Sequence, residues 1–125
     1  KTADEVAKMR VAGRLAADVL DLIEPHVQVG ITTDELNDIC HEYIVNTQKA
    51  YPAPLNYHGF PKSICTSINH VVCHGIPSSK KLKDGEVHGG VSIRVQDGNF
   101  IEGMYRPFIH EWTSSHWLAG ARLVF

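Results

Sequence analysis

The chain has 125 residues, of which 43% are hydrophobic, and a formal net charge of -2. This length predicts one domain, residues 1–125, with a modest hydrophobic core. The near-neutral charge excludes the electrostatic pattern of a nucleic-acid-binding protein, because the only basic cluster, Lys80, Lys81 and Lys83, is typical of a solvated loop.

No apolar run is long enough to cross a bilayer, and the N-terminal residues lack the basic-then-apolar pattern of a signal peptide. We therefore expect a cytoplasmic protein that does not bind a membrane. The three cysteines, Cys40, Cys65 and Cys73, contain no CxxC pair. This number and spacing predict reduced thiols rather than a disulfide framework.

A first amphipathic helix is predicted near the N-terminus. Thr2 and Glu5 form a capping-box pattern, and apolar or small residues then recur every three or four positions until Pro25. The stripe that we expect to be buried consists of Val6, Met9, Gly13, Ala16, Leu20 and Ile23.

A second amphipathic helix is predicted to begin at Thr32, which repeats the capping-box pattern with Glu35. Its apolar stripe consists of Leu36, Ile39, Cys40, Tyr43 and Ile44. The helix must end before Tyr51-Pro52, because prolines at 52, 54 and 61 make residues 50–61 a stiff loop. Loops of this kind often line sites on a rigid scaffold.

Strands are predicted in the second half of the chain. Residues 64–68 and 71–73 have the composition of two short strands around the turn residues Asn69-His70. Residues 91–95 alternate apolar and polar side chains, and Asp97-Gly98 marks a hairpin turn into the next strand. Two helices followed by strands predict an α+β fold, in which two amphipathic helices pack on an antiparallel sheet.

Eight histidines raise the possibility of a metal site, but their spacing does not favour one. The chain contains no HxH or HExxH motif, and His70 and His74, four positions apart, would share a face only on a helix. Cys73 and His74 do not form a thiol nucleophile with its base, since neighbouring residues of a strand point to opposite faces. Cys73 and Cys40 are better interpreted as buried structural residues.

The stretch YHGFPKSICTSINHVVCHGIP, residues 57–77, is similar to the substrate-pocket segment of type I methionine aminopeptidases. The similarity also covers residues 8–17 and 38–46, and motifs this long rarely recur by chance. It extends over residues 1–85, whereas residues 86–125 form a divergent, strand-rich tail. The resemblance implies the N-terminal half of the two-fold pita-bread architecture. The implied activity is metal-dependent removal of the N-terminal methionine from nascent chains.

The resemblance also assigns site residues. It implies that His74 contacts the scissile peptide and assists catalysis, and a histidine at a pocket mouth donates hydrogen bonds or shuttles protons. The residues implied to bind the substrate are Pro54, Tyr57, His58, Phe60 and Cys65. Aromatic and sulfur-bearing walls suit an unbranched thioether. Many relatives have Cys in place of Pro54 and Tyr in place of Phe60, and both changes keep the wall apolar.

The family's metal ligands are two aspartates, a histidine and two glutamates, which hold two divalent ions of cobalt, manganese, iron or zinc around a bridging water. The sequence pattern places the first aspartate position near Ser92 and the second near Glu102. A serine does not replace a bridging carboxylate, so Glu102 is the one remaining candidate ligand. Asp97 is better explained as a turn former. The resemblance places the other three ligands in a second half that this sequence lacks.

Three hypotheses follow from this comparison. The chain is a truncated or rearranged methionine aminopeptidase that needs a separate C-terminal half and acts on peptides with an N-terminal methionine. Alternatively, it is a half-domain that binds methionine or a peptide without chemistry. The third hypothesis is a structural chimera, in which foreign sequence begins near Gly85. Half of a pseudo-symmetric fold exposes an apolar face, which favours self-association.

Overall fold

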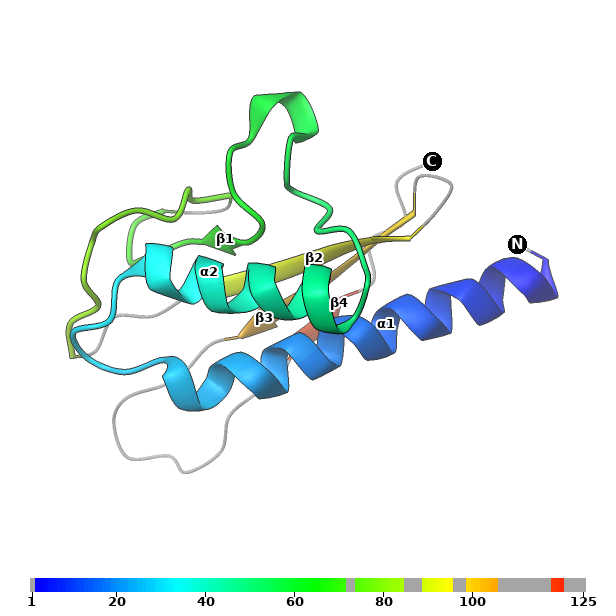
Figure 1. Cartoon of the computed structure of the whole chain (residues 1–125), viewed down its shortest axis with the longest axis horizontal. Coiled ribbons are helices and arrows are strands. Elements are labelled where there is room, and N and C mark those ends of the chain that lie inside the picture. The colour runs from blue at the N-terminus through cyan, green and yellow to red at the C-terminus, as the bar shows by residue number, and fades with distance from the viewer. Residues whose placement is uncertain (1, 72–73, 85–88, 96–98, 106–117, 121–125) are drawn as a thin grey trace.

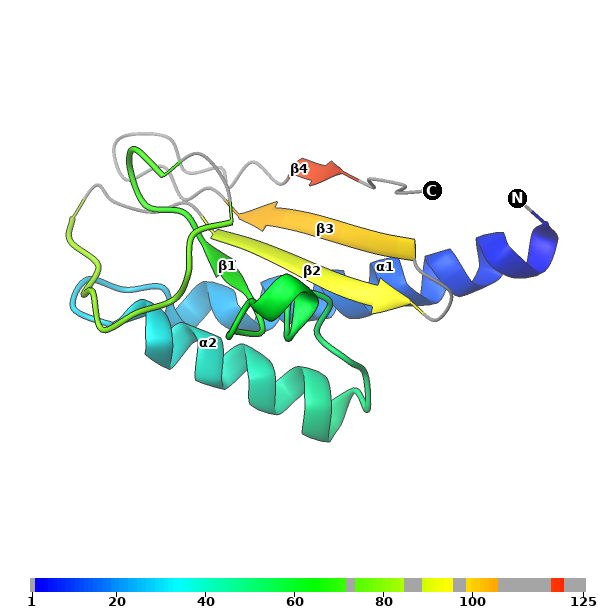
Figure 2. The ribbon, with the colours of Figure 1, turned by 90° about the horizontal axis from the view of Figure 1, so that it is seen from above.

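A computed structural model describes the fold of residues 2–71, 74–84, 89–95, 99–105 and 118–120. The elements in chain order are α1 (Ala3–Ile23), η1 (Glu24–His26), α2 (Thr33–Glu42), η2 (Tyr43–Thr47), η3 (Tyr57–Gly59), β1 (Cys65–Thr66), β2 (Gly89–Val95), β3 (Asn99–Tyr105) and β4 (Leu118–Gly120). Both long helices lie on the same side of the strands, with α1 along β2 and β3 (Figures 1 and 2). No helix within these described ranges is long and apolar enough to span a membrane.

The predicted first helix is confirmed, including the residues that begin it. The Glu5 backbone N–H donates to Thr2 Oγ1 at 3.2 Å, and the Thr2 N–H donates to Glu5 Oε2 at 2.7 Å. The buried residues of α1 are Ala12, Ala16, Val19, Leu20 and Ile23. The predicted stripe is therefore wrong at its N-terminal end, where Val6 is 39% exposed. The first turns of α1 extend past the ends of the described strands, so no described strand covers them there (Figure 1).

The second predicted helix begins at the predicted cap, but its last turns are not α-helical. In the capping box the Thr32 N–H donates to Glu35 Oε2 at 2.8 Å. After Glu42 the chain continues as the π-helical turn η2, which the Gln48 N–H closes by donating to Tyr43 O at 2.9 Å. The predicted stripe is confirmed at Leu36, Cys40 and Ile44, which are buried, whereas Ile39 and Tyr43 are half-buried.

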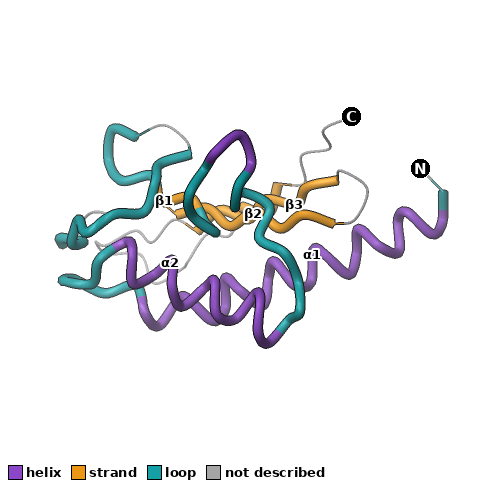
Figure 3. Tube along the Cα trace, turned by 45° about the horizontal axis from the view of Figure 1, so that its top comes forward, coloured by secondary structure: helices purple, strands orange, loops and turns teal. Residues whose placement is uncertain are grey.

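Within the described residues, four strands form one sheet in the order β1-β2-β3-β4, with every neighbouring pair antiparallel. Val95 of β2 lies opposite Asn99 of β3, as the predicted second hairpin requires. The predicted turn, Asp97-Gly98, lies outside the described residues. Figure 3 shows α1 and α2 together beneath the strands, so the described part of the fold has a helix layer and a sheet layer.

The predicted first hairpin is wrong. Among described residues 64–71, the strand is Cys65–Thr66 alone, and it pairs with Gly89–Gly90 of β2. Asn69 has a φ of 54°, and the Val71 N–H donates to Ile68 O at 3.1 Å, so residues 68–71 form a turn. Val71 is not in a strand, and residues 72–73 lie outside the described part of the chain.

The hydrophobic core joins the two helices to the segments around β1. Its buried members are Ala16, Val19, Leu20, Ile23, Leu36, Cys40, Ile44, Ile64, Ile68 and Leu82. Ile64 precedes β1 and Ile68 follows it, so the core anchors both sides of this short strand. Packing, rather than strand length, therefore holds β1 in place.

Candidate functional site

The loop between η2 and β1 is held by its own hydrogen bonds. The Asn56 N–H donates to Phe60 O at 2.8 Å, and the Tyr57 N–H donates to Pro54 O at 3.0 Å. Pro52 and Ala53 are buried and fix the base of the loop, while η3 projects away from the helices at the top of Figure 1. The predicted proline-rich loop is therefore an ordered projection beside β1.

The structure brings two of the predicted site residues into contact at the tip of this loop. The rings of Tyr57 and His58 meet edge to face, with centroids 4.4 Å apart. Tyr57 is 53% exposed, and His58 is exposed with a φ of 46°, in the left-handed region. Pro54 and Phe60 are half-buried at the two sides of the tip. A non-glycine residue with this backbone conformation costs free energy, and such residues are concentrated at binding and catalytic sites.

His74, like His58, has a left-handed backbone conformation, with a φ of 52°, and it is also exposed. The next residue, Gly75, is pressed against β1: the Thr66 N–H donates to Gly75 O at 2.8 Å, and the Gly75 N–H donates to Ser67 Oγ at 3.3 Å. A Cβ atom on Gly75 would lie 2.1 Å from Thr66 O, so only glycine fits. The contact places His74 beside the strand that carries Cys65, whose half-buried thiol is not part of a disulfide.

Two polar residues of α2 that face this region were not among the predicted site residues. Thr33 and Asn37 are buried and lie in helical register with the buried residues Cys40 and Ile44. That register was visible in the sequence. Two polar residues that continue an apolar stripe indicate buried hydrogen bonds, since unpaired polar groups are costly to bury.

The two candidate metal-ligand positions lie opposite each other on the neighbouring strands β2 and β3. In the register of β2 and β3, Ser92 is the direct partner of Glu102. The pair offers one hydroxyl and one carboxylate, and this donor set does not fit a centre in which carboxylates bridge two divalent ions. Among the residues whose side chains the structure describes, no group of three or more His, Cys, Asp or Glu is arranged to hold a metal ion.

Comparison with protein-family models gives a match to the family described as "Metallopeptidase family M24", over residues 7–95. Curated relatives include the methionine aminopeptidase of Escherichia coli, which is 61% identical over 99 residues, covering 78% of this chain and 38% of the relative. The methionine aminopeptidase of Haemophilus influenzae is 56% identical over 101 residues, covering 80% of this chain and 38% of the relative. The chain thus spans little more than a third of the length of these proteins.

Two solved structures have a similar backbone. The crystal structure of methionine aminopeptidase from Rickettsia prowazekii superposes with a TM-score of 0.74 at 52% identity, covering 83% of this chain and 42% of that protein. The crystal structure of methionine aminopeptidase from Thermotoga maritima gives a TM-score of 0.76 at 25% identity, covering 98% of this chain and 45% of that protein.

Proposed function

This chain belongs to metallopeptidase family M24, and on that premise we propose that it supplies the methionine-binding part of a methionine aminopeptidase. The proposed architecture is the N-terminal half of the pita-bread fold, with residues 1–85 as its family-like part. The proposed substrate is a peptide with an N-terminal methionine, and the proposed location is the cytoplasm, where cysteines stay reduced.

One observation beyond the family match supports the proposal: His74, like Lys49, Asn56, His58 and Asn69, has a left-handed backbone, and Gly75 holds it beside β1. The cost of this conformation is explained if the side chain must be presented to a ligand. From this position an imidazole N–H can donate a hydrogen bond to a substrate carbonyl and orient the peptide bond. The proposed role of His74 is therefore to bind the substrate carbonyl and to orient the peptide bond.

The proposed pocket walls come from the projecting loop and from β1. Pro54 and Phe60 are half-buried, and Cys65 is a half-buried thiol on β1, so each leaves part of its apolar surface for a ligand. A flexible methionine side chain gains free energy from such surfaces through burial and through sulfur–aromatic contacts. Tyr57 and His58 complete the wall at the exposed end of the loop.

We propose peptide hydrolysis only for a longer protein, one that contains this chain together with the part of its relatives that this chain does not span. The pair of Ser92 and Glu102 does not fit the family's two-ion centre, because a serine hydroxyl does not replace a bridging carboxylate. That mismatch favours a second candidate function, a half-domain that binds peptides without cleaving them. Metal stoichiometry on protein purified without chelator, together with hydrolysis of a Met-Ala-Ser peptide, distinguishes the two functions.

The experiment that tests the pocket is a nuclear magnetic resonance titration with methionine amide. The His74 ring resonances should shift saturably, together with backbone resonances of Phe60 and Cys65. Alanine amide, which lacks the thioether, is the matched control ligand and should produce much smaller shifts. Absence of any shift at millimolar methionine amide, with the protein folded, would contradict the proposal.

A further inference from the structure

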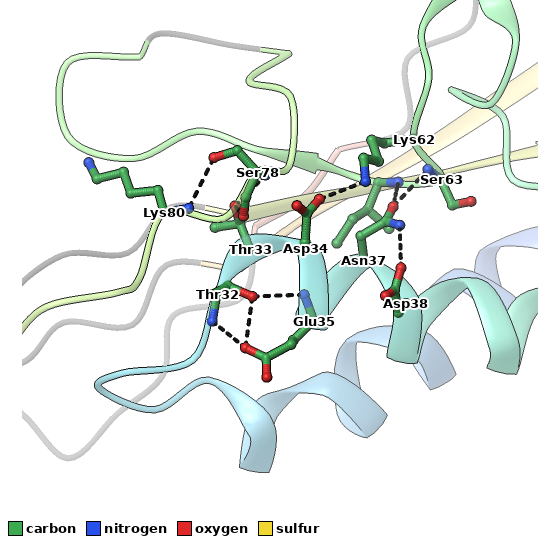
Figure 4. A network of polar contacts seen from close by, with 11 residues as sticks. Thr32, Thr33, Asp34, Glu35, Asn37, Asp38, Lys62, Ser63, Ser78 and Lys80 are labelled. Atoms are coloured by element: carbon green, nitrogen blue, oxygen red, sulfur yellow. Dashed lines mark hydrogen bonds and ion pairs between the residues drawn. The ribbon is translucent and has the colours of Figure 1, made fainter.

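One face of α2 holds both chain segments that carry the proposed site, as Figure 4 shows. Thr33 Oγ1 donates to Ser78 O at 3.0 Å and accepts from the Ser78 N–H at 2.8 Å. The Asp34 N–H donates to the same Ser78 carbonyl at 2.9 Å. These bonds fix the chain at Ser78, which lies four residues after His74.

The same helix face holds the segment that leads into β1, at three consecutive residues. Lys62 Nζ forms an ion pair with Asp34 Oδ1 at 2.6 Å. Ser63 Oγ lies 2.6 Å from His41 Nδ1. Asn37 contributes the central contact, because its Oδ1 accepts from the backbone N–H of Ser63 at 2.8 Å and from that of Ile64 at 3.4 Å.

Asn37 and the backbone that it binds are shielded from water. Asn37 is 6% exposed and Ser63 is 1% exposed, so water cannot readily replace the Asn37 carbonyl if it is removed. The Asn37 amide is oriented in turn, since Nδ2 donates to Asp38 Oδ1 at 3.2 Å. Ser63 and Ile64 lie between two proposed pocket residues, Phe60 and Cys65. A shift of this backbone would therefore move both walls.

We propose that Asn37 is a positioning residue for the methionine pocket, setting through Ser63 and Ile64 the relative placement of Phe60 and Cys65. This inference rests on the proposed methionine-binding function. Asn37 supports the proposed pocket without contacting the substrate itself. Its buried amide is needed for ligand affinity as well as for stability.

The test compares Asn37→Ala with a control variant that removes a similar bond elsewhere. The control is Gln48→Leu, because Gln48 Nε2 donates to Leu15 O at 2.8 Å, a bond to α1 rather than to the backbone of Ser63, Ile64 or Ser78. The Kd of methionine amide is measured by titration, and thermal unfolding is followed for each protein. Asn37→Asp keeps an oxygen acceptor at the same position and serves as the conservative variant.

We expect Asn37→Ala to raise the Kd tenfold or more, Asn37→Asp to recover most of the affinity, and Gln48→Leu to bind like the wild type although it is destabilised. Unchanged binding by Asn37→Ala, or equal loss of affinity in Gln48→Leu, would overturn the inference. If the wild type does not bind methionine amide, the proposed function itself fails and the inference falls with it.

A second measurement needs no variant and decides the case in which Asn37→Ala does not fold. Binding of methionine amide to the wild type should shift the side-chain amide resonances of Asn37 and the backbone amide resonances of Ser63 and Ile64. Binding that shifts His74 but leaves these three unchanged would overturn the positioning role while leaving the proposed function intact.

Discussion

Replacing Gly75 with alanine tests how tightly the segment that carries His74 is held against β1. The added Cβ would lie 2.1 Å from Thr66 O and 2.9 Å from Thr66 C, both of them backbone atoms of a hydrogen-bonded strand. Neither atom can rotate away as a side chain would, so the two segments must separate. Separation weakens the 2.8 Å bond from the Thr66 N–H to Gly75 O.

The expected cost combines these two effects. Overpacking in a close-packed region costs about 1–3 kcal/mol, and the weakened hydrogen bond adds about 0.5–1.5 kcal/mol. We therefore expect Gly75→Ala to lower the free energy of unfolding by about 2–4 kcal/mol. Urea unfolding followed by circular dichroism measures this difference, and the titration with methionine amide measures the accompanying loss of affinity.

Gly30→Ala is the matched control for Gly75→Ala. Gly30 has a φ of 94° but no atom within 4 Å of an added Cβ, so its substitution introduces backbone strain without a clash. Strain of this kind costs about 1–2 kcal/mol, and we expect no effect on binding. Wild-type stability and affinity in Gly75→Ala would refute the close approach of Gly75 and Thr66.

Three further predictions concern the helices. Leu20→Ala should destabilise the protein by about 2–5 kcal/mol in urea unfolding because Leu20 is buried in the core, and an unchanged midpoint would show that α1 buries another face. The hydrogen bond from the Thr32 N–H lowers the pKa of Glu35, so its stabilisation is present above the unfolded-state pKa and is lost as the pH falls through the lowered folded-state pKa. The stability difference between wild type and Glu35→Gln should therefore shrink below pH 4.5, the ordinary value of that carboxyl, and a constant difference would contradict the capping box. Burial raises the pKa of the Cys40 thiol to about 12, so iodoacetamide at pH 8 should modify Cys65 well before Cys40; equal rates by mass spectrometry would contradict the burial.

Local sequence patterns predicted where the helices begin, because the contacts that begin a helix join residues close together in the sequence. Both helix starts follow from a threonine with a glutamate three residues later, because the capping bonds join only those two residues. The strand at Cys65–Thr66 was paired wrongly because its true partner, Gly89–Gly90, lies far along the chain and has little strand propensity. No local pattern specifies such a pairing.

The site residues came from the family resemblance, and their roles stay predictions. The resemblance assigned Tyr57 and His58 to the pocket wall, and the structure brings their rings into contact. The left-handed backbone of His74 depends on how closely Gly75 approaches Thr66, which is a tertiary contact. The contacts of Asn37 likewise join residues 26 and 27 positions apart, beyond the range of any periodicity.

Selective recognition of an N-terminal methionine is the central claim, and calorimetry tests it most directly. The Kd of a Met-Ala-Ser peptide is compared with that of Ala-Ala-Ser on the wild-type chain, and again on His74→Ala. We expect the methionine peptide to bind the wild type at least tenfold more tightly than the alanine peptide, and we expect His74→Ala to weaken this binding. Equal affinity for the two peptides, or no binding of either to the folded protein, would contradict it.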